Sequence, residues 1–263
     1  MPNMLHLPHQ KTNSNLIAAM LAACTFLLWT LSDACFKTVS ADIPTGQSVV
    51  IVSIASVLVI VVFVLFTKNT HKLKVETKSI KILLFLGVLQ FIDMVTWLWA
   101  IPLLPLANIY LMCFLSPMII AVLASIFLKE ELGIKRILAI AAGFAGVVIA
   151  INPTGVISGE YPLLGYVWAF ASALMTAIQM LIVKKTHESA EALSVWQRAI
   201  MLVPALFLTF PTQYIALSNN DLLALIGVGT LFGIGWKLLV DAYKHASATF
   251  VAPYHLTSRK PSL

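Results

Sequence analysis

Asp93 is the residue whose type and position most suggest chemistry, because it lies halfway along an apolar run that extends from residue 80 to residue 101. An ionisable side chain in the middle of a bilayer is costly and is therefore a candidate for function. On a helix, Gln90 and Trp97 lie one turn away on the same face. The carboxylate could pair with a cationic ligand or take up a proton. The alternative is a structural contact with a neighbouring helix.

Lys237 is the corresponding cation, in a later apolar run that extends from residue 221 to residue 242. If both residues face a common cavity, Asp93 and Lys237 could form a pair or be bridged by a ligand. Alternatively, Lys237 extends its ammonium group toward the membrane surface, with Asp241 as its partner four residues later. The residues themselves leave both interpretations open.

Asp33 and Lys37 lie four residues apart near the end of the first apolar run, with Trp29 one turn before Asp33. An i,i+4 pair of opposite charges can form on one helix face. The pair either gates an opening of the bundle or neutralises two charges at the membrane surface. Trp29 could form a wall of the same opening, although core packing is the other interpretation.

Two further polar residues fall in apolar runs. Gln179 lies within residues 162–184 and is a candidate for ligand contact. Arg198 lies near the start of residues 194–214, and we interpret it as a cation that anchors this segment at the membrane surface.

The elements that carry these residues are predicted to be membrane-spanning helices. Hydrophobic residues make up 60% of the 263 positions and charged residues only 11%, whereas soluble domains carry about 25% charged residues. A crossing needs about 20 apolar residues. The sequence predicts an all-α integral membrane protein with eight spans, at 15–37, 46–67, 80–101, 105–128, 135–152, 162–184, 194–214 and 221–242.

Small residues at four-residue spacing predict where these helices approach closely. Gly229 and Gly233 form such a face, and Ala169, Ala173 and Ala177 form another.

The positive charges predict the orientation of the chain rather than a nucleic-acid partner. With residues 1–14 as a cytoplasmic tail, fourteen Lys and Arg residues fall on the cytoplasmic side, and Lys37 alone falls outside. This distribution matches the positive-inside rule. We therefore expect a multi-pass protein of the cytoplasmic (inner) membrane, with the lipid bilayer as its main partner and no nucleic acid.

Several classes of function lack their motifs. The sequence has no Gly-rich phosphate-binding loop followed by Lys and Ser or Thr, which argues against ATP as a direct energy source. Cys24, Cys35 and Cys113 have no metal-ligand spacing, and no pair of residues has catalytic spacing. We expect no cofactor and no enzymatic activity.

The segment from Leu104 to Pro153 carries motifs in a characteristic order. They are a Pro-Leu-Ala turn, a Pro in mid-helix, an aliphatic-Lys-Glu signature and a Gly-rich helix, at Pro105-Leu106-Ala107, Pro117, Leu128-Lys129-Glu130 and Gly143-Phe144-Ala145-Gly146. This segment resembles the EamA domain of the drug/metabolite transporter superfamily. The resemblance implies ten helices in two five-helix repeats of inverted topology, a 5+5 bundle common among secondary transporters.

The resemblance implies a first repeat at 15–153 and a second, incomplete repeat at 156–256. A ninth helix begins near Ala246, but the polar residues 257–263 cannot continue it, so we expect a ninth stub and a C-terminal truncation. The alternative is a genuine eight-helix protein. Aligning the repeats places Lys237 on Thr96, one turn from Asp93, which favours the Asp93–Lys237 pair.

The resemblance implies a secondary transporter that moves a small metabolite by alternating access. The substrate would be an amino acid or a derivative, with S-adenosylmethionine as one option. The alternative is a non-transporting remnant of such a carrier. A homodimer is a further expectation, because a second copy could complete the fold.

Overall fold

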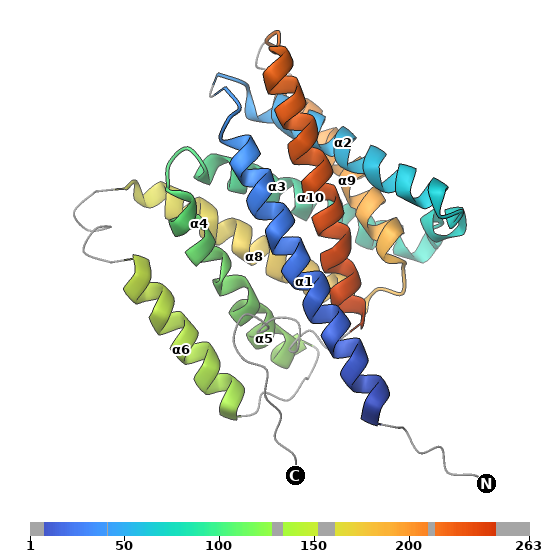
Figure 1. Cartoon of the computed structure of the whole chain (residues 1–263), viewed down its shortest axis with the longest axis vertical. Coiled ribbons are helices and arrows are strands. Elements are labelled where there is room, and N and C mark those ends of the chain that lie inside the picture. The colour runs from blue at the N-terminus through green and yellow to red at the C-terminus, as the bar shows by residue number, and fades with distance from the viewer. Residues whose placement is uncertain (1–7, 41, 128–133, 152–160, 210–213, 246–263) are drawn as a thin grey trace.

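The computed structural model describes residues 8–40, 42–127, 134–151, 161–209 and 214–245, and these residues are helical or lie in short connections. No strand occurs within these ranges, as the apolar runs predicted. The helices, in chain order, are α1 (Pro8–Phe36), α2 (Thr45–Phe66), α3 (Ile80–Ala100), α4 (Leu106–Cys113), α5 (Leu115–Phe127), α6 (Ile134–Ile151), α8 (Leu163–Lys185), α9 (Ala190–Thr209) and α10 (Asn219–His245) (Figure 1). Two short 3-10 helices, η1 (Thr70–Leu73) and η2 (Thr77–Ser79), connect α2 to α3.

The described residues contain seven helical segments that are long and apolar enough to cross a membrane, whereas eight were predicted. The difference lies at 135–152, where α6 spans 18 residues but is not one of the seven. The predicted stub from Ala246 and the tail at 257–263 lie outside the described residues. The two repeats, at 15–153 and 156–256, therefore remain a prediction.

The long helices pack as a bundle in which partners distant in sequence lie side by side. α1 packs along α10, α2 packs against α9 and α10, and α3 packs against α8 and α9 (Figure 1). Hydroxyls on α1 bond to the backbone of α10, since Thr25 Oγ1 donates to the Gly235 carbonyl at 3.0 Å. Such side-chain hydrogen bonds hold membrane helices together where water is excluded.

Small residues bring α10 into backbone contact with α2. A Cβ atom on Gly229 would lie 2.6 Å from the Val52 carbonyl oxygen, and one on Gly233 would lie 2.9 Å from Ser56 Cα. Ser56 Oγ donates to the Gly229 carbonyl at 2.6 Å. The close approach predicted from the spacing of these glycines is confirmed.

The predicted span 105–128 is interrupted in the structure. α4 ends at Cys113, Phe114 is a turn residue, and α5 begins at Leu115. Pro117 explains the interruption, because its ring nitrogen has no hydrogen to donate to the carbonyl of Cys113. Discontinuous helices of this kind often occur beside the binding sites of transporters.

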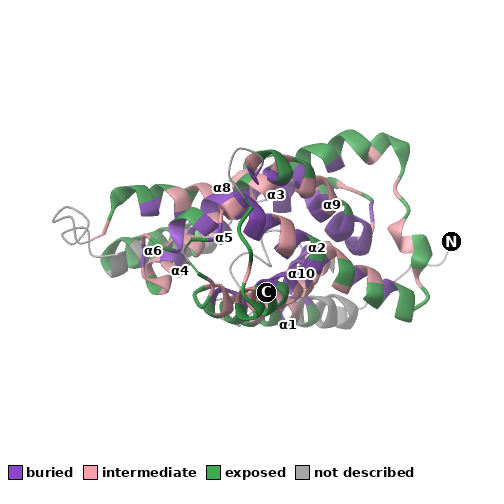
Figure 2. Ribbon diagram, turned by 90° about the horizontal axis from the view of Figure 1, so that it is seen from above, coloured by how far each residue is buried: buried purple, intermediate pink, exposed green. Residues whose placement is uncertain are grey.

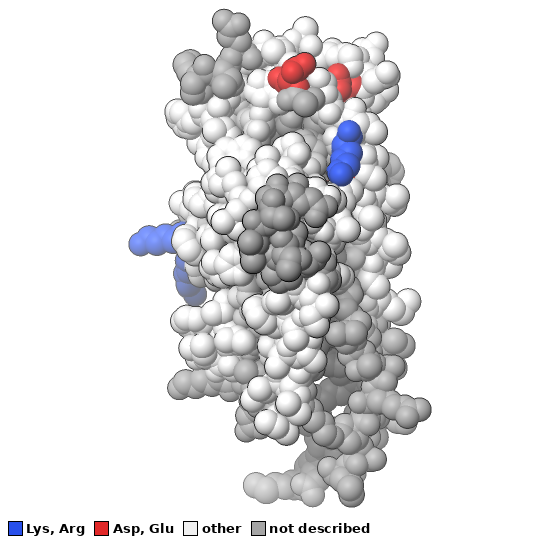
Figure 3. Space-filling view, turned by 90° about the vertical axis from the view of Figure 1, so that its left-hand side faces the viewer, with Lys and Arg blue, Asp and Glu red and all other residues white. Residues whose placement is uncertain are grey.

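The outside of the bundle is apolar, as expected for a surface that faces lipid. Large hydrophobic side chains are exposed on several helices, such as Phe66 on α2 and Phe207 on α9. Figure 2 shows the buried residues turned toward the interior of the bundle, with exposed residues outward. On the side shown in Figure 3, most of the described surface is uncharged, and acidic side chains lie near the upper end.

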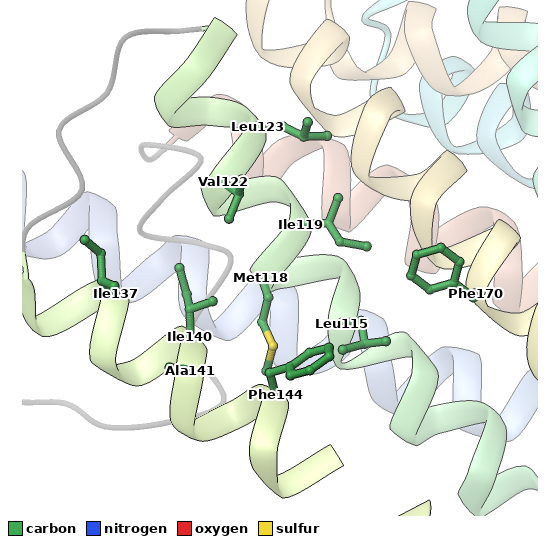
Figure 4. Close-up of a pocket in the computed structure, with 10 residues that line it drawn as sticks. All are labelled: Leu115, Met118, Ile119, Val122, Leu123, Ile137, Ile140, Ala141, Phe144 and Phe170. Atoms are coloured by element: carbon green, nitrogen blue, oxygen red, sulfur yellow. The ribbon is translucent and has the colours of Figure 1, made fainter. Parts of the chain in front are cut away.

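An apolar groove lies between α5 and α6, with Phe170 of α8 beside it (Figure 4). Met118, Ile140 and Phe144 are among its lining residues, and none of the residues that line it is charged. The groove therefore offers no charged side chain to a ligand, in contrast to the cavity described below.

Candidate functional site

A narrow and largely apolar cavity lies inside the bundle, between α1, α3, α4, α8 and α10. It differs from the groove at α6 because it contains two carboxylates among aromatic rings. The residues that line it are Phe26, Trp29, Asp33, Asp93, Met94, Trp97, Tyr110, Cys113, Ser172, Thr176, Phe232 and Trp236. The interruption between α4 and α5 follows Cys113 at its wall.

Asp93 is buried in mid-helix on α3 and is held by one face of α8. Its Oδ1 accepts a hydrogen bond from Ser172 Oγ at 2.5 Å, and its Oδ2 accepts bonds from Thr176 Oγ1 at 2.9 Å and Gln179 Nε2 at 3.0 Å. The three donors recur at spacings of four and three residues, which places them on one helix face. The structure thus brings together Asp93 and Gln179, two of the residues singled out in the sequence.

Asp33 forms a second carboxylate cluster at the same cavity. It accepts hydrogen bonds from Trp97 Nε1 at 2.9 Å and from Tyr110 OH at 2.5 Å. Trp97 lines the same cavity as Asp93, as expected from their shared helix face, and its indole bonds to Asp33. The structure does not form the Asp33–Lys37 side-chain pair between these two described residues, because Asp33 is buried and bonds to Trp97 and Tyr110 whereas Lys37 is exposed.

Lys237 does not contact Asp93. Its Nζ lies 2.5 Å from Asp241 Oδ2 and 3.8 Å from Glu191 Oε1 of α9. Neighbouring positions on a helix differ by about 100° in direction. Trp236 lines the cavity, whereas Lys237 Nζ lies near Glu191 of α9 and 5.3 Å from the ring centre of Phe63 of α2. The Asp93–Lys237 pair expected from the repeat alignment is therefore not formed in this structure, and the alternative partner, Asp241, is present.

Arg198 is the functional candidate that the sequence reasoning misjudged. It is 0% exposed, and its guanidinium lies 4.3 Å from the ring centre of Phe232 and 5.4 Å from that of Trp236. The interpretation of Arg198 as a surface anchor is wrong. α9 begins at Ala190, four residues before the predicted span, so Arg198 lies two turns inside the helix. The spacing of Ser194, Gln197 and Arg198 on one face was the signal that could have identified it.

Several buried polar atoms around this site have no hydrogen-bond partner among the described residues. They include both side-chain polar atoms of Gln90, all three guanidinium nitrogens of Arg198 and the Oε1 atom of Gln179. Gln90 lies one turn after Gly87, where a Cβ atom would be 3.4 Å from the Gln197 carbonyl oxygen. Gln90 is thus on the face of α3 that meets α9, and the polar interior extends from the cavity toward Arg198.

Comparisons with known proteins are consistent with this geometry. The EamA-like transporter family matches residues 16–152. The riboflavin transporter of Vibrio cholerae is 26% identical over 169 residues, which cover 63% of this chain and 55% of that protein. The pseudopaline exporter CntI of Pseudomonas aeruginosa is 24% identical over 91% of this chain and 81% of its own length.

The S-adenosylmethionine uptake transporter of Rickettsia bellii is 26% identical over 76% of this chain and 66% of that protein. The matches thus span about half to four fifths of the length of these relatives. A solved crystal structure with 16% identity superposes with a TM-score of 0.66 over 94% of this chain and 84% of that chain, which shows a common fold. Because the family match covers more than half of the sequence, the chain belongs to the EamA-like transporter family.

Proposed function

We propose that the chain is a secondary transporter that moves a small charged metabolite across the cytoplasmic membrane, an amino acid or a derivative of one. The observation that carries this proposal is Asp93, a buried carboxylate held by three donors of α8 at a cavity inside an apolar bundle. A buried carboxylate does not contact lipid, so lipid packing does not explain its presence. Ionisable groups placed in this way usually belong to a substrate or ion pathway.

The aromatic residues at the cavity favour a ligand with a cationic part. Trp29 lies 5.5 Å from Phe232 and 6.2 Å from Trp236, measured between ring centres. Aromatic faces attract cations such as quaternary or sulfonium groups. Phe232 and Trp236 already contact Arg198. The rings offered to a ligand cation are therefore those of Trp29 and Trp97, and Asp93 adds a negative charge. S-adenosylmethionine, which the relative from Rickettsia bellii takes up, has a sulfonium, an ammonium and a carboxylate, and it is one specific candidate.

Alternating access fits the contacts at the two ends of the bundle. At one end, Glu191 of α9 contacts Lys72 of η1 at 3.3 Å and Lys237 of α10 at 3.8 Å. Nearer the other end, Asp33 joins α1 to Trp97 of α3 and Tyr110 of α4. In the proposed transport cycle these two sets of contacts break in turn. The end with Lys72 and Lys237 faces the cytoplasm in this proposal, as does the N-terminus.

Flux into liposomes tests the proposal directly. The purified chain would be reconstituted and supplied with labelled S-adenosylmethionine, riboflavin and a panel of amino acids. We expect uptake of at least one panel member by the wild type and a loss of at least about tenfold in Asp93→Asn, because the amide keeps the shape but removes the charge. Lys78→Gln is the control, since Lys78 is exposed and its ion pair with Glu76 lies at the surface.

The outcome separates the two functional hypotheses. Transport through the Asp93 cavity is supported if flux is lost in Asp93→Asn and retained in Lys78→Gln. A folded wild-type protein that carries no panel member in either direction would instead favour the non-transporting remnant. Mass measurement of the reconstituted protein tests the proposed homodimer in the same sample.

A further inference from the structure

Arg198 is a buried guanidinium with no hydrogen bond or ion pair to the described residues. Its side chain is 0% exposed, and Nε, Nη1 and Nη2 all lack a hydrogen-bond acceptor in the part of the chain that the structure describes. Burying a charge without a partner is strongly unfavourable. A group of this kind in a folded protein therefore calls for a specific reason, such as a ligand that binds there.

The acidic residues around Arg198 are already engaged by other groups. Asp93 acts on Arg198 electrostatically, but its two carboxylate oxygens accept from Ser172, Thr176 and Gln179 on α8. Glu191, on the same helix as Arg198, pairs with Lys72 and Lys237. Arg198 is thus left with its positive charge near the cavity and its donors unused.

The surroundings of Arg198 orient it without using its N–H groups. Phe232 and Trp236 pack against the guanidinium, and both rings also line the cavity that contains Asp93. Trp236 is itself fixed, because its Nε1 donates to Gln197 Oε1 at 2.8 Å. Contact with an aromatic ring occupies no donor, so the planar fork of the arginine is free for a carboxylate.

The other unpartnered atoms include both donors and acceptors. Gln197 Nε2 and Trp29 Nε1 are donors, Gln179 Oε1 is an acceptor, and Gln90 offers one of each. This mixture matches a ligand with both a negative and a positive group rather than a simple anion or cation.

We infer that Arg198 binds the carboxylate of the transported molecule, and that the cationic end of the same molecule lies toward Asp93. This inference rests on the proposed function and specifies it: the substrate is a zwitterion with a carboxylate, such as an α-amino acid or a derivative with a larger cationic or aromatic group. A bidentate Arg–carboxylate contact supplies both the affinity and the orientation.

Direct binding to the full chain in lipid nanodiscs tests the inference without requiring transport. The probes are pairs that differ in the carboxylate alone: S-adenosylmethionine with its decarboxylated form, and methionine with methioninamide. Dissociation constants would be measured by tryptophan fluorescence for wild type, Arg198→Gln, Arg198→Lys and the surface control Lys78→Gln. The quantity that decides is the ratio of the two dissociation constants within each pair.

For the wild type we expect at least one acid to bind about 10- to 100-fold more tightly than its carboxylate-free counterpart. In Arg198→Gln the ratio should fall to near one, while the affinity for the carboxylate-free compound changes little. Arg198→Lys keeps the charge but not the fork, so its ratio should lie between the two. This variant provides the test if Arg198→Gln does not fold.

A wild-type protein that shows no preference for the acid in either pair would overturn the inference, as would a preference retained in Arg198→Gln and Arg198→Lys. The result is separable from the proposed function. A chain that binds the acids but carries no flux would refute transport and leave the role of Arg198 standing. A chain that transports a compound without any carboxylate preference would support transport and refute the role of Arg198.

Discussion

The Asp93 carboxylate and the Ser172 hydroxyl lie 2.5 Å apart, Oδ1 to Oγ, in the middle of the bundle where α3 meets α8. Thr176 and Gln179 extend the same contact along the next turns of α8. A buried carboxylate that is fully held by one neighbouring helix is oriented rather than merely tolerated. Any change in how α8 packs on α3 must therefore change the position of this charge in the cavity.

Removing one of the three α8 donors to Asp93 should lower both stability and flux, and it should do so more than a matched Thr→Val change elsewhere. Thr176→Val deletes the hydrogen bond to Asp93 Oδ2 and should destabilise the protein by about 1–3 kcal/mol, because a bond to a charged group is lost. We expect flux to fall in parallel with ligand affinity. Thr230→Val is the control, since Thr230 is half-buried and its hydroxyl donates to the Ile226 carbonyl of its own helix rather than to a buried carboxylate. Equal behaviour of the two variants in thermal unfolding and flux would contradict the prediction.

The backbone contact between α2 and α10 predicts a steric effect at two glycines. Gly229→Ala and Gly233→Ala each place a Cβ atom within 3 Å of α2, and each should lower stability by about 1–3 kcal/mol through overpacking. Gly227→Ala is the matched control on the same helix, because no atom of the described residues lies within 4 Å of its Cβ position. Thermal unfolding in detergent measures all three. A Gly227→Ala protein as unstable as the other two would refute the steric explanation.

The Asp33 cluster predicts a gate at its end of the cavity. Tyr110→Phe removes the 2.5 Å hydrogen bond to Asp33 that joins α4 to α1. We expect faster reaction of Cys113, which lines the cavity, with a thiol reagent added from outside the cell. The measurement needs Cys24→Ser and Cys35→Ser in the background. Tyr214→Phe, at an exposed tyrosine, should leave the rate unchanged. An unaltered rate in Tyr110→Phe would argue against a gate there.

The ion pairs of Glu191 predict a second gate at the opposite end. Glu191→Gln weakens the contacts to Lys72 and Lys237, which join α9 to η1 and α10. In inside-out vesicles, labelling of Cys113 should become faster by roughly three- to tenfold, because weakening the two ion pairs together should cost about 1 kcal/mol. Lys78→Gln breaks an exposed pair and serves as the control. Faster labelling from the outer face alone would reverse the assignment.

The distribution of Lys and Arg predicts the orientation of the chain. A cysteine in place of Asp42, in the connection between α1 and α2, should react with a membrane-impermeant reagent in intact cells. A cysteine in place of Lys78, at η2, should react only after the membrane is opened. Both positions are exposed, so access to the residue itself is not limiting. The opposite labelling pattern would place the N-terminus outside.

Sequence alone located seven long membrane-spanning segments and the buried carboxylate of Asp93, although it predicted an eighth span at 135–152 and missed the interruption between α4 and α5. In a bilayer, every backbone polar group must be satisfied within its own segment, so long apolar runs become helices with little dependence on their neighbours. For the same reason, a charge such as Asp93 stands out in a run that is otherwise apolar. Small residues at four-residue spacing also predicted the contact of Gly229 and Gly233, because the absence of a side chain is a local property.

The tertiary structure alone decided which polar and charged side chains contact one another across the helices. Trp97 lies one turn from Asp93 in sequence, yet its indole bonds to Asp33 of another helix. Lys237 follows Trp236 in sequence, yet the two residues point to different neighbours. The physical reason is that hydropathy defines a segment, whereas its rotation and the start of its first turn depend on packing against other helices. That rotation and the start of α9 at Ala190 turned Arg198 from an expected surface anchor into a buried cation beside the cavity.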